Sequence, residues 1–208
     1  MIIETTGVHD ALSTIVRLAG NTSWVLGGSA ALLLRGIQLG APPRDVDLYC
    51  DDDDANTIHK ALSRYAIDRP SYSETAIYRS TLSHYRIGTI QVELVGGFSV
   101  RALDCCYQVN VKEVLFPYGE AIELHELTEG RPVYVQVVPL AHELWFNLLR
   151  QRKDRVKVIA EEMRKQPLAH LPALAAIEGS NNFADEVVSE VRERIGITQK
   201  GERPWMRK

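Results

Sequence analysis

The stretch LGGSAALLLRGIQLGAPPRDVDL, residues 26–48, decides the fold. It opens on a Gly-Gly-Ser turn that follows a short run of strand-forming residues, Ser23–Leu26. We expect a helix from Ala30 to Gly36 with Ser29 as its N-cap, followed by a break at a Pro-Pro pair. The stretch closes on Asp-Val-Asp-Leu at 45–48, which alternates polar and apolar residues like a half-buried strand. It therefore predicts strand, turn, helix and strand in succession.

The predicted strand at 45–48 also provides candidate functional side chains. Alternate side chains of a strand share a face, so Asp45 and Asp47 point the same way while Val46 and Leu48 face the core. Two carboxylates roughly 6–7 Å apart on one face can ligate a hard divalent cation such as Mg²⁺. The glycines of the turn let a phosphate approach the backbone, and Ser29 adds a hydroxyl. Taken singly, each element also fits a plain connection or a solvent-facing strand edge.

In combination, these elements resemble the DNA polymerase β-like nucleotidyltransferase superfamily. Its signature is an apolar residue, Gly, then Gly or Ser, with an acidic-apolar-acidic strand downstream. The matching residues are Leu26-Gly27-Gly28-Ser29 and Asp45-Val46-Asp47-Leu48. Within the superfamily, VLGGSAALLLRG and PPRDVDLY are most similar to small bacterial AbiEii-type and antibiotic-nucleotidyltransferase-like proteins. The resemblance covers about residues 23–96 and continues weakly into Arg150–Asp154, within LRQRKD.

The resemblance implies transfer of a nucleoside monophosphate from an NTP to an acceptor with Mg²⁺ or Mn²⁺. Asp45 and Asp47 would hold the metals, and the turn residues Gly27, Gly28 and Ser29 would bind the nucleotide phosphates. The family also uses a third carboxylate on a neighbouring strand, as metal ligand and as general base. Glu93 is our candidate because it alternates with the apolar Val92 and Leu94. Aspartate is more usual at that position, and Glu74 and Asp104 remain alternatives.

Two basic residues are further candidates for the nucleotide site. Arg44 directly precedes the acidic pair, where it would either contact phosphate or neutralise Asp45. Lys153 would either reach the triphosphate, with Asp154 holding it in position, or form an ordinary ion pair at a helix start.

The remaining pattern predicts an α/β (α+β) fold. Apolar spacing and turn residues indicate helices at 8–18 and 55–65, and strands at 75–82, 85–88, 89–95 and 133–138, with a hairpin turn at 87–89. From Pro139 onward the pattern is helical, with segments through 149 and at 154–165, 171–177 and 183–195, Gly196 as a C-cap and an irregular tail at 199–208. We therefore expect a nucleotidyltransferase core, a mixed β-sheet flanked by helices, over residues 1–138, and a C-terminal helical appendage over 139–208.

Composition narrows the function classes. The chain has 208 residues and a net charge of −3, which argues against a dedicated nucleic-acid binder. Acidic residues are in excess over 1–149 and basic residues over 150–208. Such an asymmetry fits an anionic substrate held between the two parts, or chance clustering on solvated helices. The sequence has no GxGxxG or P-loop motif, and His142-Glu143 is not a zincin motif because Phe stands at position 146.

Targeting signals and cysteines predict a cytoplasmic protein. No signal peptide is visible, and the longest apolar stretch, Ala30–Leu34, is too short to span a bilayer. The three cysteines form no CxxC pair, which favours reduced thiols.

Three functional hypotheses follow from these features. The first is a Mg²⁺-dependent nucleotidyltransferase acting on an NTP and an acceptor that is a small molecule, RNA or protein, with a second subunit contributing part of the acceptor site. The second is a nucleotide-binding or interaction module without catalysis. The third is a nucleotidyltransferase toxin of a toxin–antitoxin pair, acting on tRNA or protein.

Overall fold

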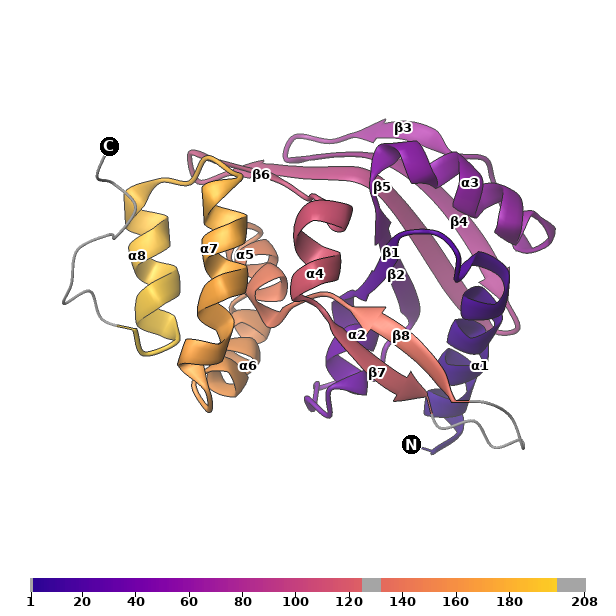
Figure 1. The fold of residues 1–208 in the computed structure, drawn as a ribbon, viewed down its shortest axis with the longest axis horizontal. Coiled ribbons are helices and arrows are strands. Elements are labelled where there is room, and N and C mark those ends of the chain that lie inside the picture. The colour runs from indigo at the N-terminus through magenta and orange to yellow at the C-terminus, as the bar shows by residue number, and fades with distance from the viewer. Residues whose placement is uncertain (1, 125–131, 198–208) are drawn as a thin grey trace.

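A mixed β-sheet organises the protein, whose computed structural model describes residues 2–124 and 132–197 (Figure 1). The sheet has eight strands in the order β3-β4-β5-β2-β1-β8-β7, with β6 paired to β5. The strands are β1 (Trp24–Gly27), β2 (Asp45–Cys50), β3 (Ser71–Glu74), β4 (Tyr78–Ile87), β5 (Ile90–Ala102), β6 (Cys105–Gln108), β7 (Glu120–Leu124) and β8 (Val133–Val137). The helices are α1 (Ile2–Ala19), α2 (Gly28–Leu34), α3 (Asp52–Leu62), α4 (Phe116–Tyr118), α5 (Leu140–Leu149), α6 (Lys153–Met163), α7 (Leu171–Gly179) and α8 (Asp185–Arg194). The tail expected at 199–208 lies outside the described residues.

Strand β2 occupies the centre of the sheet. It pairs antiparallel with β1 on one side and parallel with β5 on the other. Val46 and Leu48 are fully buried, as the alternation predicted, while Asp45 and Asp47 face the other way and are partly exposed. The mixed sheet flanked by helices confirms the predicted fold class.

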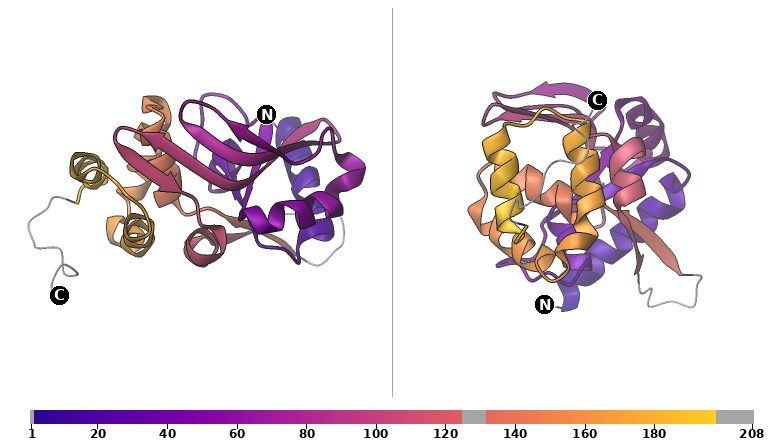
Figure 2. Two further views of the ribbon diagram at one scale, coloured as in Figure 1. Left: turned by 90° about the horizontal axis from the view of Figure 1, so that it is seen from above. Right: turned by 60° about the vertical axis from the view of Figure 1, so that its left-hand side comes forward.

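Helices cover the two faces of the sheet unequally. One hydrophobic cluster joins α1 and α3 to the Val46 and Leu48 side of β2, and the other joins α5–α8 to the opposite side, which carries Tyr49. Figure 1 shows α5–α8 gathered at one end of the molecule and α1 and α3 at the other, and the left-hand view of Figure 2 shows the same separation from above. The second cluster includes buried residues from both sides of position 138, so the helical segment packs directly on the sheet. The domain boundary at 138/139 itself stays a prediction.

Local structure differs from expectation at two places. Ser29 is not an N-cap: α2 begins at Gly28, its N-cap is Gly27, and no side chain caps it. The strand expected at 75–82 begins only at Tyr78: residues 75–77 form a turn between β3 and β4, in which the Thr75 hydroxyl accepts the N–H of Tyr78 at 3.0 Å. Strand β4 then runs unbroken to Ile87 because it pairs with β5 over its whole length. The hairpin turn between them is confirmed, with Gly88 at φ +59°.

The structure also contains elements that the sequence pattern did not indicate. Strand β5 continues to Ala102, and β6, a π-helical turn at Val111–Leu115 and β7 follow it. No helix in the described parts of the chain is long and apolar enough to cross a membrane. The three cysteines are free thiols, with Cys50 and Cys105 buried.

The aspartate run at 51–54 has a structural role. Asp52, Asp53 and Asp54 lie in the first turn of α3, where negative charge suits the helix dipole. Asp51 instead reaches across to the π-helical turn, and its carboxylate accepts the N–H groups of Val111 at 2.8 Å and Lys112 at 3.0 Å. Asp51 therefore joins the start of α3 to a segment sixty positions later.

Replacing Asp51 with Ala should lower the free energy of unfolding by about 1–3 kcal/mol, because two backbone donors lose their acceptor. Urea unfolding followed by circular dichroism measures the change. The matched control is Asp53→Ala, which removes the same charge from an exposed position of the same run and should shift stability by less than about 0.5 kcal/mol. Equal losses in the two variants would contradict a bridging role for Asp51.

Candidate active site

The candidate site is a row of residues that crosses four strands at one level. Gly27 of β1 is the register partner of Asp47 on β2, Asp47 is the partner of Glu93 on β5, and Glu93 is the partner of His84 on β4. Register partners on paired strands point their side chains to the same face. The carboxylates of Asp47 and Glu93 are thus neighbours on one face, and Asp45 is one step away on the same face of β2.

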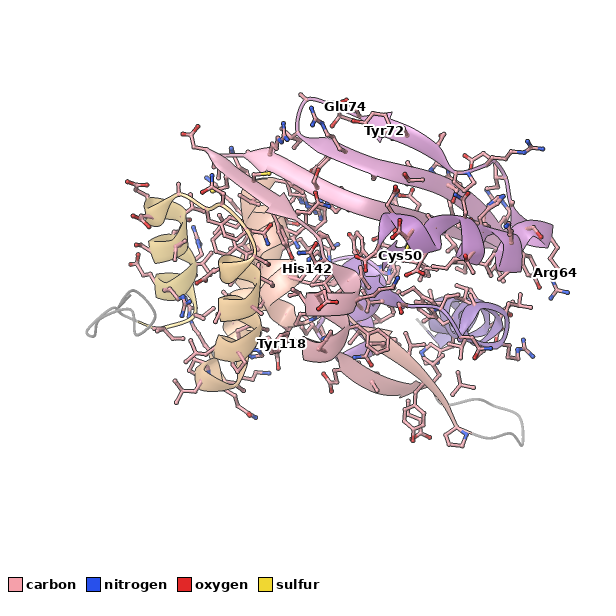
Figure 3. The ribbon with its side chains drawn as sticks, turned by 45° about the horizontal axis from the view of Figure 1, so that its top comes forward. Cys50, Arg64, Tyr72, Glu74, Tyr118 and His142 are labelled. Atoms are coloured by element: carbon pink, nitrogen blue, oxygen red, sulfur yellow. The ribbon has the colours of Figure 1, made fainter. Side chains whose placement is uncertain are left out.

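The three candidates for the third carboxylate occupy very different places. Glu93 lies beside Asp47, in the middle of the sheet. Glu74 lies on the outer strand β3, where it accepts hydrogen bonds from Tyr72 at 2.8 Å and Arg79 at 2.6 Å. Figure 3 shows Glu74 and Tyr72 together at that margin. Asp104 lies in the turn that links β5 to β6. Only Glu93, among the three, shares the row with Asp47.

Negative charge accumulates around Asp47. The pKa of the Asp47 carboxyl is raised to about 7, first by burial and then by the neighbouring carboxylates of Asp45, Glu93 and Glu143. The guanidinium of Arg150 opposes this effect. A carboxylate cluster that repels itself in this way is a setting in which a bound proton or cation is favourable.

The donor set fits a hard divalent cation in its chemistry. Asp45, Asp47 and Glu93 offer carboxylate oxygens, the ligands that Mg²⁺ prefers, and a cation would relieve the repulsion on Asp47. Within residues 2–124 and 132–197, no three His, Cys, Asp or Glu side chains lie close enough together to hold a metal ion. These carboxylates would therefore share a cation with other ligands, as Mg²⁺ sites that include substrate phosphates do.

The glycine turn is required by its close approach to the acidic strand. Gly28 has φ +65°, and a Cβ on it would lie 2.0 Å from Oδ2 of Asp47. A Cβ on Gly27 would lie 2.3 Å from the ring of Tyr49. A larger side chain at position 28 would force the Asp47 carboxylate to move, and one at position 27 would force the Tyr49 ring to move. Ser29 follows as the second residue of α2 and is partly exposed.

A polar stripe on α5 contacts this turn. Glu143 accepts the N–H of Gly28 through Oε1 at 2.6 Å, and its Oε2 accepts a hydrogen bond from Nδ2 of Asn147 at 3.1 Å. Oδ1 of Asn147 in turn accepts Nη2 of Arg150 at 2.9 Å. Glu143 and Asn147 are each 1% exposed, so the stripe is buried between the helix and the sheet. Glu143 already occupies the Gly28 donor that the sequence suggested for phosphate.

Burial is the main influence on Glu143 and on its neighbour His142. Burial raises the pKa of Glu143, although the Gly28 N–H, Arg150, Asn147 and Arg35 act in the opposite direction. Burial lowers the pKa of His142 to about 3, and its ring lies 2.7 Å from the Tyr107 hydroxyl. Figure 3 shows His142 in the interior, between the helical segment and the sheet. His142 is thus a neutral core residue.

Sequence reasoning missed Glu143, Asn147 and Arg150. Their spacing at i, i+4 and i+7 places them on one face of α5. The available signal was the composition of LAHELWFNLL, in which every residue is buried, including one acid and one amide. A buried polar side chain needs a partner, which marks such positions as contacts.

The two expected basic residues lie farther out. Arg44 is exposed just before β2, and Lys153 is exposed at the first position of α6. Asp154 bonds to Arg152 through both carboxylate oxygens, at 3.0 and 2.9 Å, so it does not act as the holder of Lys153 that the sequence suggested. The basic residue whose charge reaches both Asp47 and Glu143 is Arg150.

The far end of the row is built from a histidine and an aspartate. Nδ1 of His84 lies 2.6 Å from Oδ2 of Asp68, and the backbone N–H of His84 donates to Oδ1 of Asp68 at 2.7 Å. The row therefore runs from a glycine turn, through two carboxylates, to an imidazole held by a carboxylate.

Comparison with known proteins identifies the fold. Neither a known family model nor a curated protein sequence matches this chain. A crystal structure of a protein from Thermotoga maritima, provisionally assigned as a nucleotidyltransferase, aligns with a TM-score of 0.56 and 21% identity over 75% of this chain and 92% of that one. The chain therefore has the nucleotidyltransferase fold that the sequence predicted. The narrower resemblance to AbiEii-type proteins stays a prediction.

Two more distant structures belong to the antibiotic-resistance factor ANT(2'')-Ia. Its solution structure aligns with a TM-score of 0.48 and 12% identity over 92% of this chain and 97% of that one. Its complex with adenylyl-2''-tobramycin aligns with a TM-score of 0.40 and 15% identity over 93% and 97%. These likenesses are too distant to support an argument about the present chain.

Replacing Asp47 with Asn should stabilise the metal-free protein at high pH. Because the folded-state pKa of Asp47 is raised from 3.8 to about 7, its contribution to stability is complete below pH 4 and is lost as pH rises through 7. The amide of Asp47→Asn does not ionise. The free energy of unfolding of this variant should therefore exceed that of the wild type by an amount that grows between about pH 5 and about pH 8 to a few kcal/mol, at most about 4. Urea unfolding in EDTA at both pH values measures it, with Asp53→Asn as the control. An advantage of the same size at both pH values would contradict the charge cluster.

Proposed function

We propose that this chain is a nucleotidyltransferase that moves a nucleoside monophosphate from an NTP to an acceptor hydroxyl with the help of Mg²⁺ or Mn²⁺. The observation that carries the proposal is the register of the row, which places Asp47 beside Glu93, with Asp45 on the same face and a glycine turn at its end. The nucleotidyltransferase fold supports it. Fold likeness alone does not specify a reaction, so the proposal rests on the side chains.

The acidic residues would hold the metal ions. Asp45 and Asp47 would ligate through their carboxylates, with Glu93 completing the set on the neighbouring strand. Bound divalent cations neutralise charge on the triphosphate and stabilise the attacking and leaving oxygens of such a displacement. The repulsion that raises the Asp47 pKa would then become attraction for the cations.

The transfer itself is a substitution at the α-phosphorus. The acceptor oxygen forms a bond to that phosphorus, the bond to the bridging oxygen of the β-phosphate breaks, and pyrophosphate leaves. The carboxylate of Glu93 is our candidate to take the proton of the acceptor hydroxyl. An in-line path puts the nucleophile and the leaving group on opposite sides, so we place the triphosphate over the turn end of the row and the acceptor over the His84 end.

Several finer expectations belong to the same proposal. The acceptor is a small molecule, an RNA or a protein, and a second subunit contributes part of its site. A reducing, cytoplasmic setting suits the three free cysteines. Arg44 and Lys153 remain candidates for contact with the nucleotide from its exposed side.

Calorimetric titration of the protein with ATP, GTP, CTP and UTP in the presence of Mg²⁺ tests the binding half of the proposal. The wild type should bind at least one of them, and EDTA should abolish that binding. Asp45→Asn and Asp47→Asn should each weaken metal-dependent binding by about tenfold or more, because each removes a charged ligand. Asp53→Asn, the same change at an exposed position, should bind like the wild type.

A second measurement separates catalysis from binding. Release of pyrophosphate from the bound NTP, assayed with small hydroxyl compounds, RNA and protein extracts, should occur in the wild type and fall in Glu93→Gln. Metal-dependent NTP binding without release under any of these conditions would favour the module without catalysis. Equal metal-dependent binding by the wild type and by both Asp→Asn variants would overturn the metal assignment.

A further inference from the structure

We infer that Arg150, the C-cap residue of α5, is the phosphate-binding cation of the nucleotide site, held in place by Asn147 and Glu143 of that helix. The inference rests on the proposed function and goes beyond it, because it assigns part of the nucleotide site to the helical segment. It also names a residue different from the exposed Arg44 and Lys153.

Position is the first argument. A continuous chain of hydrogen bonds runs from the Gly28 N–H to Glu143, then to Asn147, and then to the guanidinium of Arg150, with donor–acceptor distances of 2.6, 3.1 and 2.9 Å. Gly28 itself lies against the carboxylate of Asp47. The guanidinium is thereby tied to the turn and the metal-binding strand rather than to the outer surface of the helical segment.

Preorganisation is the second argument. The guanidinium carbon of Arg150 lies 4.1 Å from the centroid of the Phe146 ring, so the group is stacked as well as hydrogen-bonded. Arg150 is only partly exposed. A planar cation fixed on two sides suits recognition of phosphate oxygens.

Charge balance is the third argument. Glu143 occupies the Gly28 N–H, so the turn presents a buried carboxylate where it would otherwise offer a donor. A triphosphate would also meet Asp45, Asp47 and Glu93. Metal ions offset the strand carboxylates, but an additional cation on the helix side would offset Glu143.

The other nearby basic side chains are less suited to this role. Arg152 is engaged by Asp154. Arg35 lies at the opposite end of α2, where it forms an ion pair with Glu120 and donates to the Val138 carbonyl. Arg150 is therefore the basic residue that combines a fixed guanidinium with proximity to the turn.

The test compares Arg150→Gln with Lys157→Gln, which removes the same charge from an exposed position of α6. Glutamine at 150 keeps amide N–H groups that can donate to Asn147 but carries no charge. Binding of Mg²⁺ with inorganic tripolyphosphate, and of Mg²⁺ with the NTP that the wild type prefers, is measured by calorimetry. We expect Arg150→Gln to weaken the affinity for both ligands by about 10- to 100-fold. Lys157→Gln should change either affinity by less than about threefold. Arg150→Lys should recover part of the affinity that Arg150→Gln loses.

Thermal unfolding of each variant separates binding from packing. A merely structural Arg150 would lower the melting temperature without lowering tripolyphosphate affinity, and that result would overturn the inference. So would Arg150→Gln binding both ligands as tightly as the wild type, which would leave the proposed function intact. If the wild type binds neither an NTP nor tripolyphosphate with Mg²⁺, the proposed function fails and the inference fails with it. If Arg150→Gln does not fold, Arg150→Lys takes its place in the test. Tripolyphosphate binding by Arg150→Lys with the affinity and salt dependence of the wild type would then count against a phosphate contact made by the guanidinium.

Discussion

Hydrogen bonding of β2 to a strand on each side is the constraint on which the site depends. Pairing with β1 places Asp47 beside the glycine turn, and pairing with β5 places it beside Glu93. A slip of one residue in either ladder would turn the carboxylates toward α1 and α3 and expose Val46 and Leu48 instead. The fully buried Val46 and Leu48 therefore oppose a one-residue slip, because their burial would be lost in it. Stability of the sheet and geometry of the site come from the same pairing.

Buried polar groups extend this constraint into the helical segment. The contact between Glu143 and Gly28 is a charged acceptor on a backbone donor in the interior, and leaving either group unpaired would be costly. It fixes where α5 lies relative to the turn, whereas the apolar surface around it would tolerate small displacements. The cost appears at Asp47, whose pKa is raised first by burial of the carboxyl and then by the like charges gathered around it. Functional sites commonly carry such a cost, because groups poised for a ligand are not at their most stable without it.

Local patterns were sufficient for half of the site. The glycine turn and the alternation around Asp45 and Asp47 each follow from a few consecutive residues, whereas Glu93 was a candidate beside which Glu74 and Asp104 stayed open. The prediction of Ser29 as an N-cap was wrong. The N-cap rule considers only neighbouring residues, whereas the Gly28 N–H is bonded by Glu143, which lies more than a hundred positions away. Asp154 was paired with the wrong base for a similar reason: adjacency in sequence suggested Lys153, while the side-chain geometry selected Arg152. The strand boundaries at 71–87 were also misplaced, since a side-chain hydrogen bond of Thr75 decides where one strand ends and the next begins.

By itself, the sequence determined which segments form strands and helices around the turn, and it determined that two aspartates share one face. These conclusions follow from the two-residue period of a strand and from the backbone freedom of glycine. Only the tertiary structure decided that Glu93 stands beside Asp47, that Glu143 accepts the Gly28 N–H, and that Arg150 bonds to Asn147 while Lys153 is exposed. These relations join residues far apart in the chain, and they depend on strand order, strand register and the rotation of α5 about its axis. Such quantities are set by the packing of the whole core, so a short stretch of sequence does not encode them.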